Sequence, residues 1–272
     1  MLLLLATMSA CAEQNPGPFD LEPAGTLIPR ELLDCHGDRD GSITAEELPL
    51  IAGVTAHTRV QYGASFSSAG SRSDRGLVWT VPDDGEILDI ATEPIDGAWF
   101  EERFPDASYA VTTDPAVAFE DQILGVYRVE DDGVRLLGLA SRNPDRPAGG
   151  LLMPYSVPSP TVLRFPVELG DEWEAVGQVE DGLISGAPYT AEDTYHIRVD
   201  ARGTISTPDA DIRDALRLSV SVTIRTAILE PVVRREFMWY RECLGEVARA
   251  VAPDDVGDEE ITSAVQLRSA AF

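Results

Sequence analysis

The chain has 272 residues and a formal net charge of −26, from 21 basic and 47 acidic residues. Its length suffices for one large all-β domain or for two smaller domains. Every basic residue is arginine, which excludes Schiff-base lysines, phosphate-loop lysines and serine–lysine dyads. The acidic excess repels nucleic acid and anionic lipid headgroups, so we expect no nucleic-acid partner. It favours cations, or it serves solubility alone.

The first eleven residues form an apolar run that ends in Met-Ser-Ala followed by Cys11. This run resembles the signal of bacterial lipoproteins, although it is short and lacks the usual leading basic residues. The resemblance implies a lipid on Cys11 that anchors the protein to a membrane of the bacterial cell envelope. Because Ala12 follows the cysteine, it also implies the outer membrane, facing the periplasm or the cell surface. A plain apolar tail with an isolated cysteine is the alternative.

Residues 12–28 are rich in turn formers and indicate a flexible tether. Residues 29–52 predict a short helix–loop–helix. Pro29 can occupy the first turn of its first helix, and Pro49 limits the second helix, which begins near Ala45.

The loop between these two predicted helices resembles the calcium-binding loop of an EF-hand. Such a loop takes oxygen ligands at positions 1, 3, 5 and 12, a backbone carbonyl at position 7, and glycine at position 6. Position 1 is a histidine, a nitrogen donor where carboxylate is preferred, so we expect a weak Ca²⁺ site. A degenerate loop held by hydrogen bonds from backbone to Asp side chains is the alternative. The candidate metal ligands are His36, Asp38, Asp40, Ser42, Thr44 and Glu47.

Three cysteines are present, and lipid on Cys11 would leave an even number. An exported chain would meet an oxidising compartment, so Cys35 and Cys243 are expected to form a disulfide. Two unrelated buried thiols are the alternative. The bridge would join the calcium-loop segment to the C-terminal strands.

Residues 53–272 read as an antiparallel β-body with an apolar period of two. Residues 123–129 and 134–139 flank an acidic glycine turn and predict a hairpin. Residues 216–226 alternate strictly between apolar and polar side chains, which predicts one buried and one solvent-facing side. The fold class expected is mainly β, as a curved antiparallel sheet or a two-sheet sandwich after the short N-terminal helix–loop–helix. The loop 142–150 could divide this body into two halves.

Four short motifs in residues 158–252 recur in this order in β-rich modules of uncharacterised envelope and secreted bacterial proteins, which the region resembles. The resemblance implies antiparallel β-structure in the envelope and brings no catalytic residues. The motifs are Gly170-Asp171-Glu172-Trp173, Thr207-Pro208, Leu216-Arg217-Leu218 and Trp239-Tyr240.

The sequence contains no zinc-type cluster of His and Cys and no G-x-S-x-G elbow. We therefore expect a non-enzymatic envelope lipoprotein, a binding or structural module whose protein or apolar-ligand partner is unknown. One alternative is a carrier that holds an apolar ligand in a curved β-sheet half-barrel. Another is a hydrolase whose residues converge only in three dimensions, with His57 or His196 beside an acid.

Overall fold

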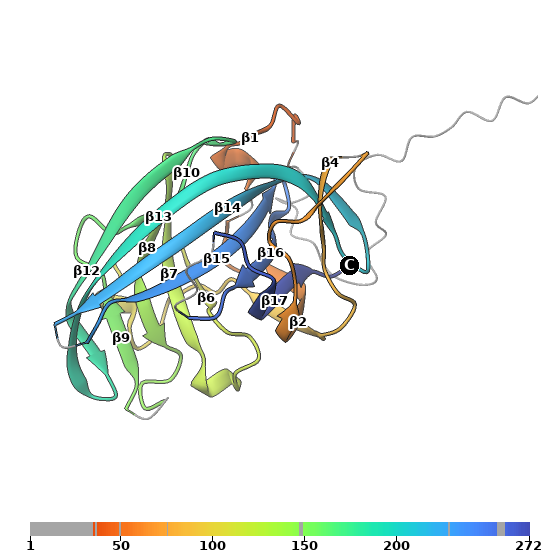
Figure 1. Cartoon of the computed structure of the whole chain (residues 1–272). Helices are drawn as coiled ribbons and strands as arrows, with labels where there is room; N and C mark the ends of the chain where they lie inside the picture. Colours follow the sequence, from red (N-terminus) through yellow and green to blue (C-terminus); the bar gives the residue numbers. More distant parts are fainter. Residues whose placement is uncertain are drawn as a thin grey trace, which may run out of the picture.

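The computed structural model describes residue 35 and residues 37–48, 50–74, 76–146, 149–227, 229–254 and 259–272. These residues form seventeen strands and three short 3-10 helices (Figure 1). Their bounds are β1 Ser42–Ile43, η1 Ala45–Glu47, β2 Thr55–Ser65, β3 Ser71–Ser73, β4 Gly76–Thr80, β5 Glu86–Ala91, η2 Glu101–Arg103, β6 Tyr109–Thr112, η3 Phe119–Asp121, β7 Ile123–Glu130, β8 Gly133–Ser141, β9 Leu151–Pro154, β10 Thr161–Arg164, β11 Val167–Glu168, β12 Glu172–Ile184, β13 Ala187–Ser206, β14 Asp211–Thr226, β15 Val232–Arg241, β16 Gly245–Val251 and β17 Ser263–Ala270.

One curved sheet contains fifteen of these strands, in the main order β5-β2-β17-β16-β15-β14-β13-β12-β9-β8-β7-β6. The long strands β12 to β15 bend strongly as they cross the molecule (Figure 1). The two ends of the path meet where Glu93, just after β5, bridges to Ala110 of β6 through N–O contacts of 2.8 and 2.7 Å. Pairing is antiparallel except between β4 and β13. The predicted curved antiparallel sheet is confirmed.

The predicted N-terminal helix–loop–helix is wrong. Residues 45–47 form one 3-10 turn, and the structure contains no α-helix in its described residues. Two contacts explain the difference: β1 pairs with β11, and the carbonyl of Glu47 accepts the N–H of Cys243 at 2.7 Å instead of continuing a helix. The first predicted helix, near Arg30, lies outside the described residues. No helix in the described part of the chain is long and apolar enough to cross a membrane.

The predicted hairpin and the predicted continuous alternation are both present. β7 and β8 pair around Asp131-Asp132, and β14 pairs with β13 and β15 along most of its length. Leu216, Leu218 and Val220 are buried on one side of β14, which we call the inner face. β8 and β9 also pair directly around the loop 142–150, so the sheet is continuous there, and the division into two halves stays a prediction.

The opposite, outer face of β14 is less exposed than the alternation predicts. Arg217 is only 6 % exposed because segments after β2 and before β17 cover this end of the sheet. An aromatic cluster fills the space beneath them, with the rings of Trp79 and Trp239 5.4 Å apart and Phe66 edge-on to Trp239. Both faces of this part of the sheet are therefore buried.

Ion pairs lie on the inner face. Arg249 of β16 bonds Glu246 at 2.6 and 2.9 Å and Glu236 at 2.9 Å, and all three side chains keep 24–28 % of their surface exposed. Burial would raise the pKa of Glu246, but the charge and hydrogen bonds of Arg249 outweigh it and hold that pKa below its ordinary value. Tyr127 of β7 packs against the inner-face cluster. Burial raises its pKa, which the charge of Arg249 lowers and the charges of Glu236 and Glu246 raise. Charged and apolar side chains thus share the inner face.

Candidate metal centre

The calcium-loop segment, residues 37–48, closes one end of the inner core. Ile43 is 1 % exposed and Leu48 is 5 % exposed, and both pack in the same cluster as Val199 and Leu216. β1 adds a short ladder to Val167 on β11. Apolar burial and two strand residues therefore fix the second half of the loop.

Three carboxylates converge at this segment. One ligand oxygen each from Asp38, Glu47 and Glu242 lie within 4.8 Å of one another. Glu47 is 8 % exposed and Glu242 is 5 % exposed, whereas Asp38 is exposed. Like charges at this separation repel, and two of them are withdrawn from water, so the arrangement favours a cation.

The Glu47 carboxylate is held by the loop itself. The backbone N–H and the hydroxyl of Thr44 both donate to one oxygen at 3.0 Å, and the N–H of Asp38 approaches the other at 3.4 Å. Asp40 N–H donates to Asp38, and Ser42 N–H donates to Asp40. Each carboxylate oxygen has two lone pairs, so Oε2 of Glu47 is fully used, while Oε1 of Glu47 and the Asp38 carboxylate keep acceptor capacity for an ion. These bonds also show how the loop keeps its shape through hydrogen bonds.

Glu242 comes from the tight turn between β15 and β16. It accepts the N–H of Arg39 at 3.0 Å, and its Oε2 lies 3.1 Å from a guanidinium nitrogen of Arg241. The approach is close: a Cβ on Gly37 would lie 2.5 Å from Oε2 of Glu242, so a larger residue there would displace this carboxylate. The sequence pattern missed Glu242 because it is separated from Arg39 by 203 positions. Its position beside Cys243, which is predicted to bond to Cys35 near the loop, is the one feature of the sequence that could have placed Glu242 at this site.

The predicted bridge between Cys35 and Cys243 is formed, with an S–S distance of 2.06 Å and a Cα–Cα distance of 5.6 Å. Both distances lie in the normal range for a disulfide. The bridge joins the start of the calcium-loop segment to the turn that carries Glu242.

The structure thus brings together some of the predicted ligands and not others. Asp38 and Glu47 share one site, while the Asp40 carboxylate is not a member of that group. Thr44 Oγ1 is engaged with Glu47, and Ser42 lies in β1, paired with Glu168. His36 and the predicted lipidation site Cys11 lie outside the described residues.

The chemistry of this donor set suits a hard cation. Ca²⁺ takes six to eight oxygen ligands, and carboxylates are its strongest protein donors. Among the described residues, the guanidinium of Arg241 is the one positive side chain paired with this group, so the three carboxylates carry the larger charge. A divalent ion would remove the repulsion and tie the loop to the β15–β16 turn.

Two histidines lie beside acids, as the hydrolase alternative requires. His57 Nδ1 is 2.6 Å from Asp89, and His196 Nδ1 is 3.3 Å from Glu174. The side chains of both pairs are 42–68 % exposed on strand surfaces. Neither pair lines the surface hollow that opens at β12 and β13.

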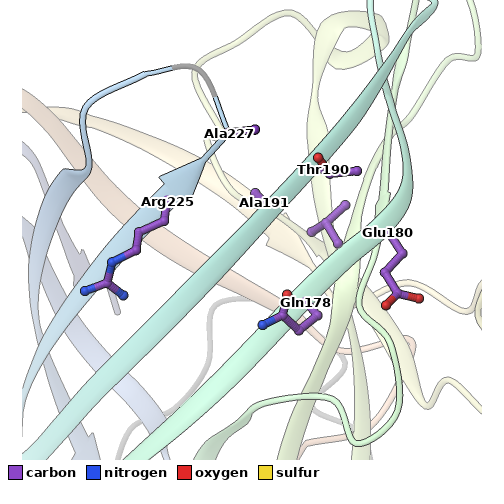
Figure 2. A pocket seen from close by; sticks show the side chains of 7 residues that line it. Gln178, Glu180, Thr190, Ala191, Arg225 and Ala227 are labelled. Atoms are coloured by element: carbon purple, nitrogen blue, oxygen red, sulfur yellow. The ribbon is translucent and has the colours of Figure 1, made fainter.

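A surface hollow of about 300 Å³ opens where β12 and β13 shift register. Figure 2 shows Gln178 and Glu180 on β12 and Arg225 on β14, on either side of β13. The lining contains one carboxylate and neither histidine nor cysteine, so it offers no metal-ligand cluster. The acidic group at the calcium loop is the better candidate site.

The fold and the site together define a curved antiparallel β protein with an acidic, disulfide-linked loop. No known protein family and no curated protein matches the chain. Two crystal structures resemble it. One, from Bacteroides fragilis, is described as exported with a YmcC-like fold; it has 11 % identity, a TM-score of 0.37, and coverage of 84 % of this chain and 97 % of its own. The other, from Parabacteroides distasonis, is described as a lipoprotein; it has 10 % identity, a TM-score of 0.35 and the same coverages. At TM-scores this low, neither likeness defines the fold or the function of this chain.

Proposed function

We propose that the protein is an exported, lipid-anchored, non-enzymatic module of the bacterial envelope whose N-terminal loop binds one Ca²⁺. The observation that carries the calcium proposal is the convergence of Asp38 and Glu47 with Glu242. Two of these side chains were chosen by EF-hand spacing alone, and the third arrives independently from the far end of the chain. Glu242 then supplies the carboxylate that loop position 1 lacks.

The bound ion would act as a structural cross-link. It would join the calcium-loop segment to the β15–β16 turn and so hold Ile43 and Leu48 in the inner core. A ligand that binds only the folded state stabilises that state by mass action. Calcium is therefore proposed as a stabiliser of the end of the sheet, at the concentrations of an extracellular-type site.

The anchoring proposal rests on Cys11 and the Met-Ser-Ala that precedes it. The Cys35–Cys243 bridge supports export, because disulfides persist in oxidising compartments. Replacing Cys11 with serine in a Gram-negative host should move the protein from the membrane fraction to the soluble fraction. An unchanged distribution would contradict the lipid anchor.

The carrier alternative is less well supported. An apolar ligand needs an apolar concavity, whereas the inner face carries Glu236, Glu246 and Arg249. The hydrolase alternative rests on two histidine–acid pairs whose side chains are 42–68 % exposed and therefore little shielded from water. The module therefore remains the preferred proposal.

Calcium binding is tested by titration calorimetry and thermal melts of the full chain carrying Cys11→Ser, with EDTA, Ca²⁺ and Mg²⁺ compared. At a free Ca²⁺ concentration about 100 times Kd we expect a stabilisation of about 2.7 kcal/mol. Glu242→Gln should abolish most of it, because the isosteric amide loses the charge. Glu102→Gln, an exposed carboxylate in η2 that is not a member of the acidic group, is the matched control. No heat of binding and no change of melting temperature with Ca²⁺ would contradict the proposal.

A further inference from the structure

The disulfide and the three carboxylates are immediate neighbours. Cys35 lies three residues before Asp38, and Cys243 directly follows Glu242. The N–H of Cys243 also donates to the carbonyl of Glu47 at 2.7 Å. Asp38 and Glu242 are thus linked along the chain to Cys35 and Cys243, and Glu47 is linked to Cys243 by a backbone hydrogen bond.

The two halves of the calcium-loop segment are held in different ways. The second half, with Glu47, is fixed by the burial of Ile43 and Leu48 and by the β1–β11 ladder. The first half, with Asp38, is exposed and is held by the bridge and by the contact of Arg39 with the Glu242 carboxylate. Opening the bridge would free the first half while the second half stays in the core.

We propose that the Cys35–Cys243 bridge sets the calcium affinity of the loop, so that the site is both redox-dependent and calcium-dependent. The inference rests on the proposed calcium site. In the reducing step a dithiol supplies two electrons and two protons, the S–S bond breaks, two cysteine thiols form, and the dithiol becomes its own disulfide. Cys35 is half-buried and is more exposed than Cys243, so we expect a reductant to attack the sulfur of Cys35.

The physical basis is the cost of assembling the ligands. Without the bridge, Asp38 is held near Glu242 through residues 39–42, which link it to Ile43 in the core, and through the contact of Arg39 with Glu242. More of the cost of ordering the first half must then be met by the bound ion. A covalent link raises the effective concentration of one ligand group near the other. Thermodynamic linkage makes the effect reciprocal: if the bridge tightens Ca²⁺ binding, then bound Ca²⁺ protects the bridge by the same factor.

The first test compares Ca²⁺ affinity by calorimetry for two full chains. One carries Cys11→Ser and keeps the bridge, and the other carries Cys11→Ser, Cys35→Ser and Cys243→Ser. We expect binding to weaken about 10-fold or more without the bridge, within the usual range of coupling between sites. Circular dichroism verifies that the sheet remains folded, and Glu102→Gln in the bridged chain should leave the affinity unchanged.

The second test holds even if the serine variant fails to fold. The bridged chain is equilibrated with dithiothreitol in saturating Ca²⁺, in Mg²⁺ or in EDTA, and free thiols are counted by mass spectrometry after alkylation. Ca²⁺ should shift the midpoint of reduction toward more dithiothreitol, and Mg²⁺ should not. Equal midpoints together with a bound ion would overturn the redox coupling and leave the calcium site standing. No binding to the bridged chain would overturn both.

Discussion

The calcium-loop segment and the hairpin stack β12–β16 are stabilised in opposite ways. In the stack, neighbours along the chain are neighbours in the sheet, since each strand pairs with the next one. The calcium-loop segment has almost no regular structure and depends on remote partners: β11, the β15–β16 turn and Cys243. We therefore expect the stack to unfold cooperatively and the segment to open at a lower free energy than the stack.

A large loss of stability is expected from a substitution in the stack that breaks the ion pairs of the buried Arg217. Arg217 bonds Asp200 at 2.7 Å and Glu260 at 2.9 Å, also bonds the carbonyl of Ser68, and has a side chain only 7 % exposed. Arg217→Ala leaves Asp200, whose side chain is 11 % exposed, without its buried cation, whereas Glu260 is 39 % exposed and can be solvated. The loss in the free energy of unfolding should be about 3 kcal/mol, at the lower end of the range for a broken buried pair. Urea denaturation measures it.

Arg198 provides the matched control because it also pairs with Asp200, at 3.4 Å, but with a side chain 49 % exposed. Arg198→Ala should cost less than about 1 kcal/mol. Similar losses for the two variants would show that the outer face of β14 is not buried as described.

A second pair of variants compares the two regions directly. Leu218 of β14 and Ile43 of the calcium-loop segment are 0 % and 1 % exposed in the same cluster. Leu218→Ala should cost about 2–5 kcal/mol globally, because a cavity opens in the cooperative sheet. Ile43→Ala should cost less, because the segment can detach, but it should weaken Ca²⁺ binding. Hydrogen exchange locates the opening, and equal global losses would mean that the segment unfolds only with the sheet.

Calcium should stabilise the calcium-loop segment more than the β12–β16 stack. We expect saturating Ca²⁺ to raise the Tm of the full chain carrying Cys11→Ser by roughly 5–10 °C. It should slow exchange in residues 37–48 more than in the stack. Glu47→Gln should remove the response, because Glu47 is the buried carboxylate that the loop contributes. Protection confined to the stack would place the ion elsewhere.

The smallest effect is pH-dependent and lies on the inner face. Burial raises the pKa of Asp193 above its ordinary value, against the hydrogen bond from Tyr155 and the charge of Arg234, which lower it. Because the folded-state pKa is the higher one, ionising Asp193 destabilises the fold, and this penalty grows as pH rises from the ordinary pKa through the raised one. Asp193→Asn should therefore gain stability at neutral pH and lose that gain in acid. Melts from about pH 3 to about pH 7 test this, and a constant difference would contradict it.

The error in the N-terminal helices shows where local patterns mislead. The residues at the end of the calcium loop, 45–48, include good helix formers, yet only one 3-10 turn forms. Ser42 and Ile43 gain a strand partner in β11, and the Glu47 carbonyl gains one in Cys243, so tertiary contacts satisfy the groups that a helix would have used. The prediction of a solvent-facing side for β14 was wrong at Arg217 for a related reason, because segments distant in the sequence cover this residue.

By itself the sequence determined the mainly antiparallel β class, the hairpin around Asp131-Asp132, the alternation of β14 and the pairing of Cys35 with Cys243. These features follow from neighbours one or two residues apart and from cysteine parity, which the chain carries locally. Only the tertiary structure decided that the sheet closes at Glu93 and Ala110 and that Glu242 joins the loop carboxylates. Those contacts depend on the summed twist and register of many strands, which no local pattern records.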